Sequence, residues 1–189
     1  MLTNPSPILT ALVGDRPPVG EYVPHRDLWQ GTVTSIATGS VFLNYFTADK
    51  TESISTITAY TGSTAAGATP TVCRMAAFSV AANGDLTRVA VTPNDTTLFG
   101  STYTAYAKAF SAPFTKQQGQ RYALGLLVVT GAAAPNFIGL PYVNATIVSN
   151  MLNDTPALTA RLAGQTDMPS SIAVGSLLAT AARIGFRIS

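Results

Sequence analysis

Between Thr71 and Val91, side chains alternate between two faces with a period of two residues. Such a period is typical of a β-strand, because successive side chains point to opposite sides of a sheet. Asn83-Gly84-Asp85 interrupts the stretch with a residue that tolerates a positive φ and a glycine that prefers one. The pattern predicts a β-hairpin with its turn at Gly84.

Further short strands are expected on both sides of this hairpin. Tyr122–Val129 is the most apolar run and predicts a central strand that is buried on both faces. A tract at residues 151–164 allows at most about two turns of helix, because Pro156 and Gly164 flank it. The remaining predicted strands cover residues 32–36, 41–46, 54–60, 104–112 and 182–188. Eight or so strands are the number found in a two-sheet jelly roll, so the sequence predicts an all-β, jelly-roll-like β-sandwich.

The beginning of the chain has a different character. Its prolines, which fix φ and remove backbone donors, predict an extended Pro-rich N-terminal arm over residues 1–30. Residues 31–189 are then expected to form the β-sandwich domain, with an irregular segment at residues 131–170. We expect the arm to become ordered against a neighbouring subunit. The candidate assembly residues in the arm are Ile8, Leu9, Leu12 and Tyr22.

The composition favours a protein that packs against other subunits. Charged residues make up 11% of the 189 residues, against about 25% in a typical globular protein. The net charge is +2, and the eleven Lys and Arg residues are scattered, which disfavours nucleic-acid binding. The sequence shows neither a signal peptide nor a strongly apolar stretch of about 18 residues, so we expect no membrane partner.

Catalytic residues are sparse. With one Cys and one His, the chain offers no disulfide and no Cys/His metal site, and Cys73 is expected to be a small buried apolar residue. Asp49 with Glu52, or Asp85 with Asp95, could form a carboxylate pair. Because these acids lie in predicted turns, we expect them to be solvated and unperturbed. The sequence therefore predicts no enzyme activity, no cofactor and no metal site.

Aromatic residues give an alternative interpretation as a sugar-binding module. Their rings can stack on the apolar faces of sugars, while Asn or Asp groups bind hydroxyls. Five aromatic residues are candidates for stacking on a host-surface glycan: Trp29, Tyr60, Tyr103, Tyr106 and Tyr142. A cluster of these rings lining a concave face would favour adhesion, and buried rings would favour a structural role.

Several segments resemble virion proteins of tailed phages that infect actinobacteria. These segments are residues 57–62, 65–75, 78–90, 119–128 and 161–170. The resemblance implies a jelly-roll-like structural protein of the phage particle without enzyme activity, such as a minor tail or tail-tip subunit. A capsid decoration protein and a glycan-binding adhesin are the alternatives. It further implies synthesis in the host cytoplasm, residence in the virion, other virion proteins as partners and, by analogy with other jelly-roll virion proteins, a homotrimer.

Overall fold

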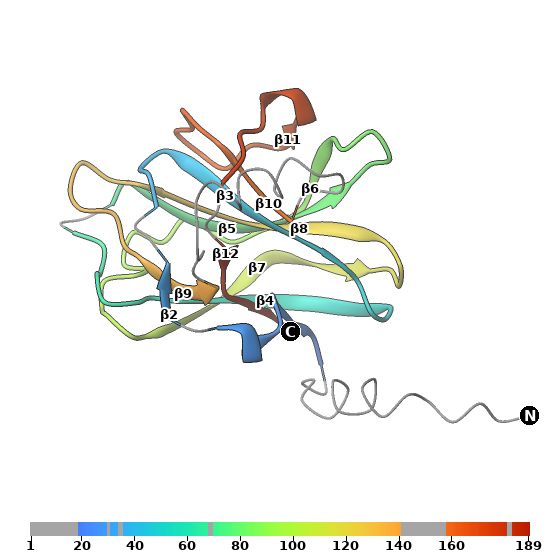
Figure 1. The fold of residues 1–189 in the computed structure, drawn as a ribbon, viewed down its shortest axis with the longest axis horizontal. Coiled ribbons are helices and arrows are strands. Elements are labelled where there is room, and N and C mark those ends of the chain that lie inside the picture. The colour runs from blue at the N-terminus through green and yellow to red at the C-terminus, as the bar shows by residue number, and fades with distance from the viewer. Residues whose placement is uncertain (1–18, 30, 34–35, 68–69, 141–157, 181–182) are drawn as a thin grey trace, which may run out of the picture.

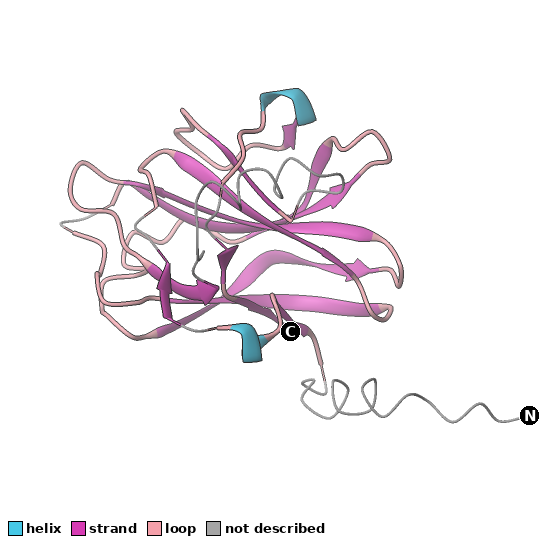
Figure 2. Cartoon of the chain, viewed as in Figure 1, coloured by secondary structure: helices cyan, strands magenta, loops and turns pink. Residues whose placement is uncertain are grey.

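The computed structural model describes residues 19–29, 31–33, 36–67, 70–140, 158–180 and 183–189. These residues form strands joined by loops and two single-turn 3₁₀ helices (Figure 2). The strands are β1 (Glu21–Val23), β2 (Gly31–Val33), β3 (Ser40–Thr47), β4 (Glu52–Tyr60), β5 (Val72–Val80), β6 (Leu86–Val91), β7 (Ala105–Lys116), β8 (Arg121–Val129), β9 (Phe137–Leu140), β10 (Thr159–Leu162), β11 (Ser171–Ile172), β12 (Arg183–Ile184) and β13 (Phe186–Ile188). The 3₁₀ helices are η1 (Arg26–Leu28) and η2 (Val174–Ser176).

The strands are arranged in antiparallel sheets that pack as layers (Figure 1). A six-stranded sheet, in the order β10-β3-β8-β5-β6-β11, curls into a half-barrel. It faces a four-stranded sheet in the order β1-β13-β4-β7, and a small sheet, β12-β9-β2, lies at one end. The prediction of an all-β sandwich is confirmed. The third sheet was not predicted.

Two clusters of buried apolar side chains hold the layers together. The larger cluster lies between the two main sheets and includes Ile57, Met75, Leu126 and Phe186, each fully buried. The smaller one lies on the opposite face of the six-stranded sheet and includes Phe78. Because both faces of this sheet are covered, β8 is buried from Tyr122 to Val128, which confirms the central strand predicted from the sequence.

The hairpin predicted from Asn83-Gly84-Asp85 is present. β5 pairs with β6 in antiparallel register, and Gly84 has a φ of +91°. The Asn83 side chain donates to a carboxylate oxygen of Asp85, and Asp85 accepts a hydrogen bond from the backbone N–H of Val174 at 2.8 Å. The turn therefore also supports the segment around η2.

Several regular strands lie in parts of the chain that were expected to be irregular or weakly helical. Glu21–Val23, expected in the arm, pairs with β13, and the absence of proline from Val19–Val23 leaves its backbone donors free to do so. Within the segment expected to be irregular, β9 and β10 are regular strands. The described part of the weakly helical tract is β10 rather than helix, because pairing with β3 outweighs a weak local preference. Residues 1–18 and 141–157 lie outside the described residues, so the extended arm stays a prediction for residues 1–18.

Candidate anchor site at the first strand

β1 is an end strand of the four-stranded sheet and directly follows residues 1–18 and the turn at Gly20. Its pairing partner is β13, close to the C-terminus of the chain: Glu21 lies opposite Ile188 and Val23 opposite Phe186. Three residues of ladder hold a strand only weakly. Two groups of side chains add further contacts, and together with β1 they form the candidate anchor site.

The first group is an ion cluster around Lys116, the last residue of β7. The Lys116 side chain is fully buried, and its Nζ contacts three carboxylates, from Glu21, from Asp49 at 2.8 Å and from Glu52 at 3.0 Å. Backbone groups join the cluster, since Gly20 N–H donates to Glu52 and Asp49 N–H donates to Glu21. The cluster thus links β1 to the β3–β4 turn, to β4 and to β7.

Strand alternation explains why a lysine points inward here. Phe114 and Lys116 are two residues apart on β7 and therefore lie on the same, core-facing side. Register places Glu52 opposite Lys116 on the neighbouring strand. This cluster was not predicted from the sequence, because the strand predicted there ended at residue 112. A lysine two residues beyond a core phenylalanine was the signal that could have revealed it.

The expectation that Asp49 and Glu52 are solvated is wrong. Their side chains retain only 14% and 15% of their exposure, because Lys116 draws them against the end of β7. The carboxylate oxygens of Glu21, Asp49 and Glu52 lie within 4.8 Å of one another, a spacing that also suits a metal ion. Lys116 already contacts all three groups, so its ammonium supplies the positive charge that a metal would bring.

Burial sets the protonation of Glu21. Desolvation, followed by the hydrogen bond with Asp49, raises the pKa of Glu21 from 4.5 to about 7, although Lys116 acts in the opposite direction. For Glu52, burial also raises the pKa, but hydrogen bonds from Lys116, Lys50 and Gly20 outweigh it, and the net shift is downward. Two acids of one cluster therefore titrate in different pH ranges.

We expect the stability of the protein to fall between about pH 5 and about pH 8 through Glu21. Because the folded state binds this proton more tightly than the unfolded chain, the contribution of Glu21 is complete below about pH 4.5 and is lost as the pH rises through 7. Urea denaturation of the wild type and of Glu21→Gln between about pH 5 and about pH 8 measures this pH dependence of stability. The variant should lack this part of the slope, and parallel stability curves would contradict the assignment.

The second group is aromatic and lies beside β1. The Trp29 ring sits between Tyr22 and Tyr60, with ring centroids 5.6 and 5.0 Å apart and edge-to-face geometry in both pairs. Its indole N–H donates to the carbonyl of Pro24 at 2.9 Å. The guanidinium groups of Arg26 and Arg187 lie 5.5 and 5.9 Å from the centre of the Tyr22 ring. This cluster fastens β1 and η1 to β13 and β4.

The residues predicted for glycan stacking are divided between two places. Trp29 and Tyr60 meet in the aromatic cluster, together with Tyr22 from the predicted assembly set. Tyr106 instead packs against Phe99 of the core, and Tyr103 is 69% exposed. Ile8, Leu9, Leu12 and Tyr142 lie outside the described residues.

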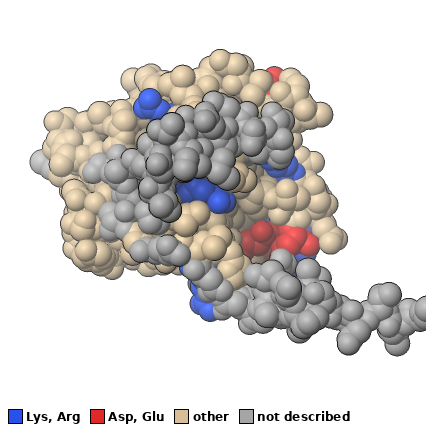
Figure 3. All heavy atoms as spheres, in the orientation of Figure 1, with Lys and Arg blue, Asp and Glu red and all other residues tan. Residues whose placement is uncertain are grey.

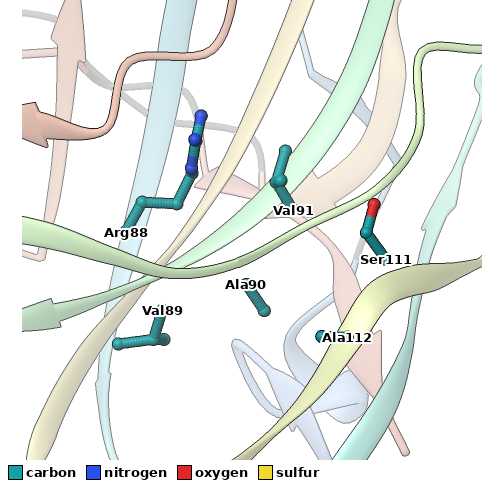
Figure 4. Close-up of a pocket in the computed structure, with 6 residues that line it drawn as sticks. All are labelled: Arg88, Val89, Ala90, Val91, Ser111 and Ala112. Atoms are coloured by element: carbon teal, nitrogen blue, oxygen red, sulfur yellow. The ribbon is translucent and has the colours of Figure 1, made fainter.

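The surface offers few other features for recognition. Figure 3 shows a face on which most described atoms belong to neither acidic nor basic residues. A hollow of about 160 Å³ lies between β6 and β7, lined by Arg88, Val89, Ala90, Val91, Ser111 and Ala112 (Figure 4). The Arg88 guanidinium already donates to the carbonyl of Met168, which leaves Ser111 as the other polar side chain in the lining. A specific small-molecule site normally has several convergent polar groups.

Cys73 is fully buried, and burial raises the pKa of its thiol to about 12, as expected for an inert structural cysteine. Among the described residues, no helix is long and apolar enough to cross a membrane. No protein-family model matches the sequence, and no curated protein is significantly similar to it.

Proposed function

We propose that this chain is a structural subunit of a tailed-phage virion, in the tail or tail tip, attached to its neighbours through residues 1–18. The observation that carries the proposal is the fixation of β1, the strand next to these residues, by a buried ion cluster and an aromatic cluster. A segment that holds a subunit in an assembly needs such a fixed starting point, because load on the segment is transmitted to this strand.

The strand pairing supports a jelly-roll-like fold for this subunit. In chain order, β1, β3, β4, β5, β6, β7, β8 and β13 pair as nested antiparallel partners: β1 with β13, β3 with β8, β4 with β7, and β5 with β6. These pairings are those of one long hairpin rolled into two sheets. Jelly rolls of this kind build both viral capsid domains and lectin domains. The fold is therefore compatible with a virion protein but does not distinguish it from a protein with another function.

The low charge of the chain also suits a subunit that is covered by neighbours. A capsid decoration protein would share these properties, so the capsid surface is the alternative location on the particle. The proposal includes no enzyme activity. Lys116 contacts all three carboxylates of the ion cluster, and the lining of the hollow between β6 and β7 has few polar groups.

A glycan-binding adhesin is the second alternative, and the arrangement of the aromatic rings speaks against it. Sugars stack on the flat face of a ring, whereas Trp29 lies edge to face between Tyr22 and Tyr60. Two arginines also approach the Tyr22 ring. Binding of labelled protein to host-type bacterial cells, with competing sugars, tests this alternative directly.

The presence of the protein in purified particles tests the proposed function. We expect antibodies against the β-sandwich to label intact virions of a phage that encodes this chain, at the tail in electron micrographs. Labelling of the capsid shell would favour the decoration protein. Detection only in the lysate, with none in purified particles, would contradict the proposal.

We further expect deletion of residues 1–18 to abolish incorporation into particles while the β-sandwich stays folded. The deletion ends before β1, so it keeps every described residue of the ion and aromatic clusters. Circular dichroism and thermal unfolding check the fold, and complementation of a phage lacking the gene checks incorporation. Normal incorporation of the truncated chain would show that other surfaces hold the subunit.

A further inference from the structure

β7 is a long edge strand whose outer side has no backbone partner within the part of the chain that the structure describes. It comprises twelve residues, about twice the usual length of a strand, and ends the order β1-β13-β4-β7. An open edge carries unpaired N–H and C=O groups that can pair with another chain.

The hydrogen-bond pattern identifies which residues present these groups. Thr56 of β4 exchanges two backbone hydrogen bonds with Ser189, at 2.8 and 3.0 Å, so its N–H and C=O point away from β7. The same parity applies to Thr58 and Tyr60, two and four residues further along β4. The β7 residues opposite these three positions must then direct their own backbone groups to the open edge: Ala105, Ala107 and Ala109.

Other observations agree with this parity. Thr61 N–H donates to the carbonyl of Thr104 at 3.0 Å, which shows that the alternate residues of β4 are the ones that face β7. Ala105, Ala107 and Ala109 are all exposed. A row of three N–H and three C=O groups therefore faces solvent along one straight part of β7, before the register shift that follows Ala109.

Edge strands of free monomers are usually protected by charge, and lysine is the common choice. Both lysines of β7 are unavailable for this purpose. Lys108 forms an ion pair with Asp95 at 2.6 Å, and Lys116 is buried in the ion cluster. The outward side chains along the open edge are methyl groups, so a second strand would meet neither charge nor bulk.

We propose that this edge pairs with the same edge of a second copy, antiparallel and with Ala107 on the two-fold axis. In this register Ala107 lies opposite its own copy and Ala105 lies opposite Ala109. All three positions then form hydrogen-bonded pairs, and every open backbone group between Ala105 and Ala109 finds a partner. The two four-stranded sheets would join into one continuous sheet.

The composition of the edge favours a second copy over an unrelated chain. In two-fold pairing the same segment of β7 lies on both sides of the new contact, so a net charge on this edge would repel its copy. This edge avoids that repulsion because its two cations are neutralised within their own chain. The pairing does not involve residues 1–18, so it goes beyond the attachment proposed above, and it predicts a dimer where the sequence resemblance implied a trimer.

Cysteine cross-linking tests the register in the full-length protein. The Cα atoms of an antiparallel hydrogen-bonded pair lie about 5.5 Å apart, inside the range of roughly 4.4 to 6.8 Å that a disulfide spans. With a mild oxidant, Ala107→Cys should therefore give a covalent dimer of twice the 19.6 kDa chain mass. The native Cys73 is buried and should remain inert.

Matched controls come from the same strand. Ala105→Cys should not cross-link to its own copy, since the two positions would lie about 13 Å apart. A mixture of Ala105→Cys with Ala109→Cys should give the mixed covalent dimer. Without oxidant, Ala107→Lys should convert the dimer seen in sedimentation velocity into monomer, while Ser53→Lys, an exposed position on β4, should leave it unchanged.

The proposal is overturned by a wild-type protein that stays monomeric or forms only trimers. It is also overturned when Ala107→Cys and Ala105→Cys cross-link equally, or when neither does. Loss of the dimer in Ala107→Lys with normal particle incorporation would leave the attachment through residues 1–18 intact. The failure of one proposal can thus be told from the failure of the other.

Discussion

Lys116→Met should lower the free energy of unfolding by about 3–5 kcal/mol, a large part of the stability of a typical domain. The substitution keeps the length and apolar stem of the side chain but removes the buried ammonium group, which contacts Glu21, Asp49 and Glu52. The three acidic side chains would then share a confined site that has lost its buried ammonium, although Lys50 would still pair with Glu52. Urea denaturation near neutral pH measures the loss.

The same substitution at Lys108 provides the control. Lys108 lies on the same strand and pairs with Asp95 at 2.6 Å, but the two side chains retain 30% and 23% of their exposure. Ion pairs that solvent can reach contribute roughly 0–1 kcal/mol, so Lys108→Met should be nearly neutral. Adding Glu21→Gln to Lys116→Met should recover part of the lost stability. Equal effects of the two lysine substitutions would argue against a special role for the buried cluster.

Trp29→Ala should cost roughly 2–4 kcal/mol, somewhat less than the removal of a fully buried tryptophan. The Trp29 ring covers Gly185 so closely that a Cβ at that glycine would come within 2.7 Å of it. Loss of the ring opens a cavity between Tyr22 and Tyr60 and removes two edge-to-face contacts. Thermal and urea unfolding measure the effect.

Tyr103→Ala is the matched aromatic control. The Tyr103 side chain is 69% exposed, so its loss should change stability by less than about 0.5 kcal/mol. A comparison of Trp29→Ala with Tyr103→Ala also distinguishes the structural interpretation from the adhesin interpretation. If Trp29→Ala left stability unchanged but abolished binding to host-type cells, Trp29 would be a sugar platform rather than part of the anchor.

Local patterns predicted the parts of the fold that depend on local sequence. The β5–β6 hairpin follows from strict alternation around Gly84, and β8 follows from a continuous apolar run. Both signals lie within a short stretch of sequence and need no knowledge of distant partners. For the same reason, the burial of Cys73 could be expected from its place inside a predicted strand.

The anchor site could not be predicted in this way. β1 has only three residues and exists because β13, at the other end of the chain, pairs with it. The ion cluster brings together Glu21, Asp49, Glu52 and Lys116 from three distant parts of the sequence. In the sequence these four residues look like ordinary charged residues of turns and strand ends, and only the folded sheet brings them together. Trp29 and Tyr60 could be selected by residue type, but not their edge-to-face packing.

Hydrogen exchange at β1 tests most directly the claim that this strand is the fixed base of the N-terminal segment. Ser189 exchanges backbone hydrogen bonds with Thr56 of β4. Backbone groups alternate in direction along a strand, so Ile188 and Phe186 direct theirs to β1 instead. Their partners are the amides of Glu21 and Val23. These two amides should exchange with a free energy of opening close to that of global unfolding, although β1 is short and at a sheet edge. Exchange at the rate of a fraying terminus would contradict the account.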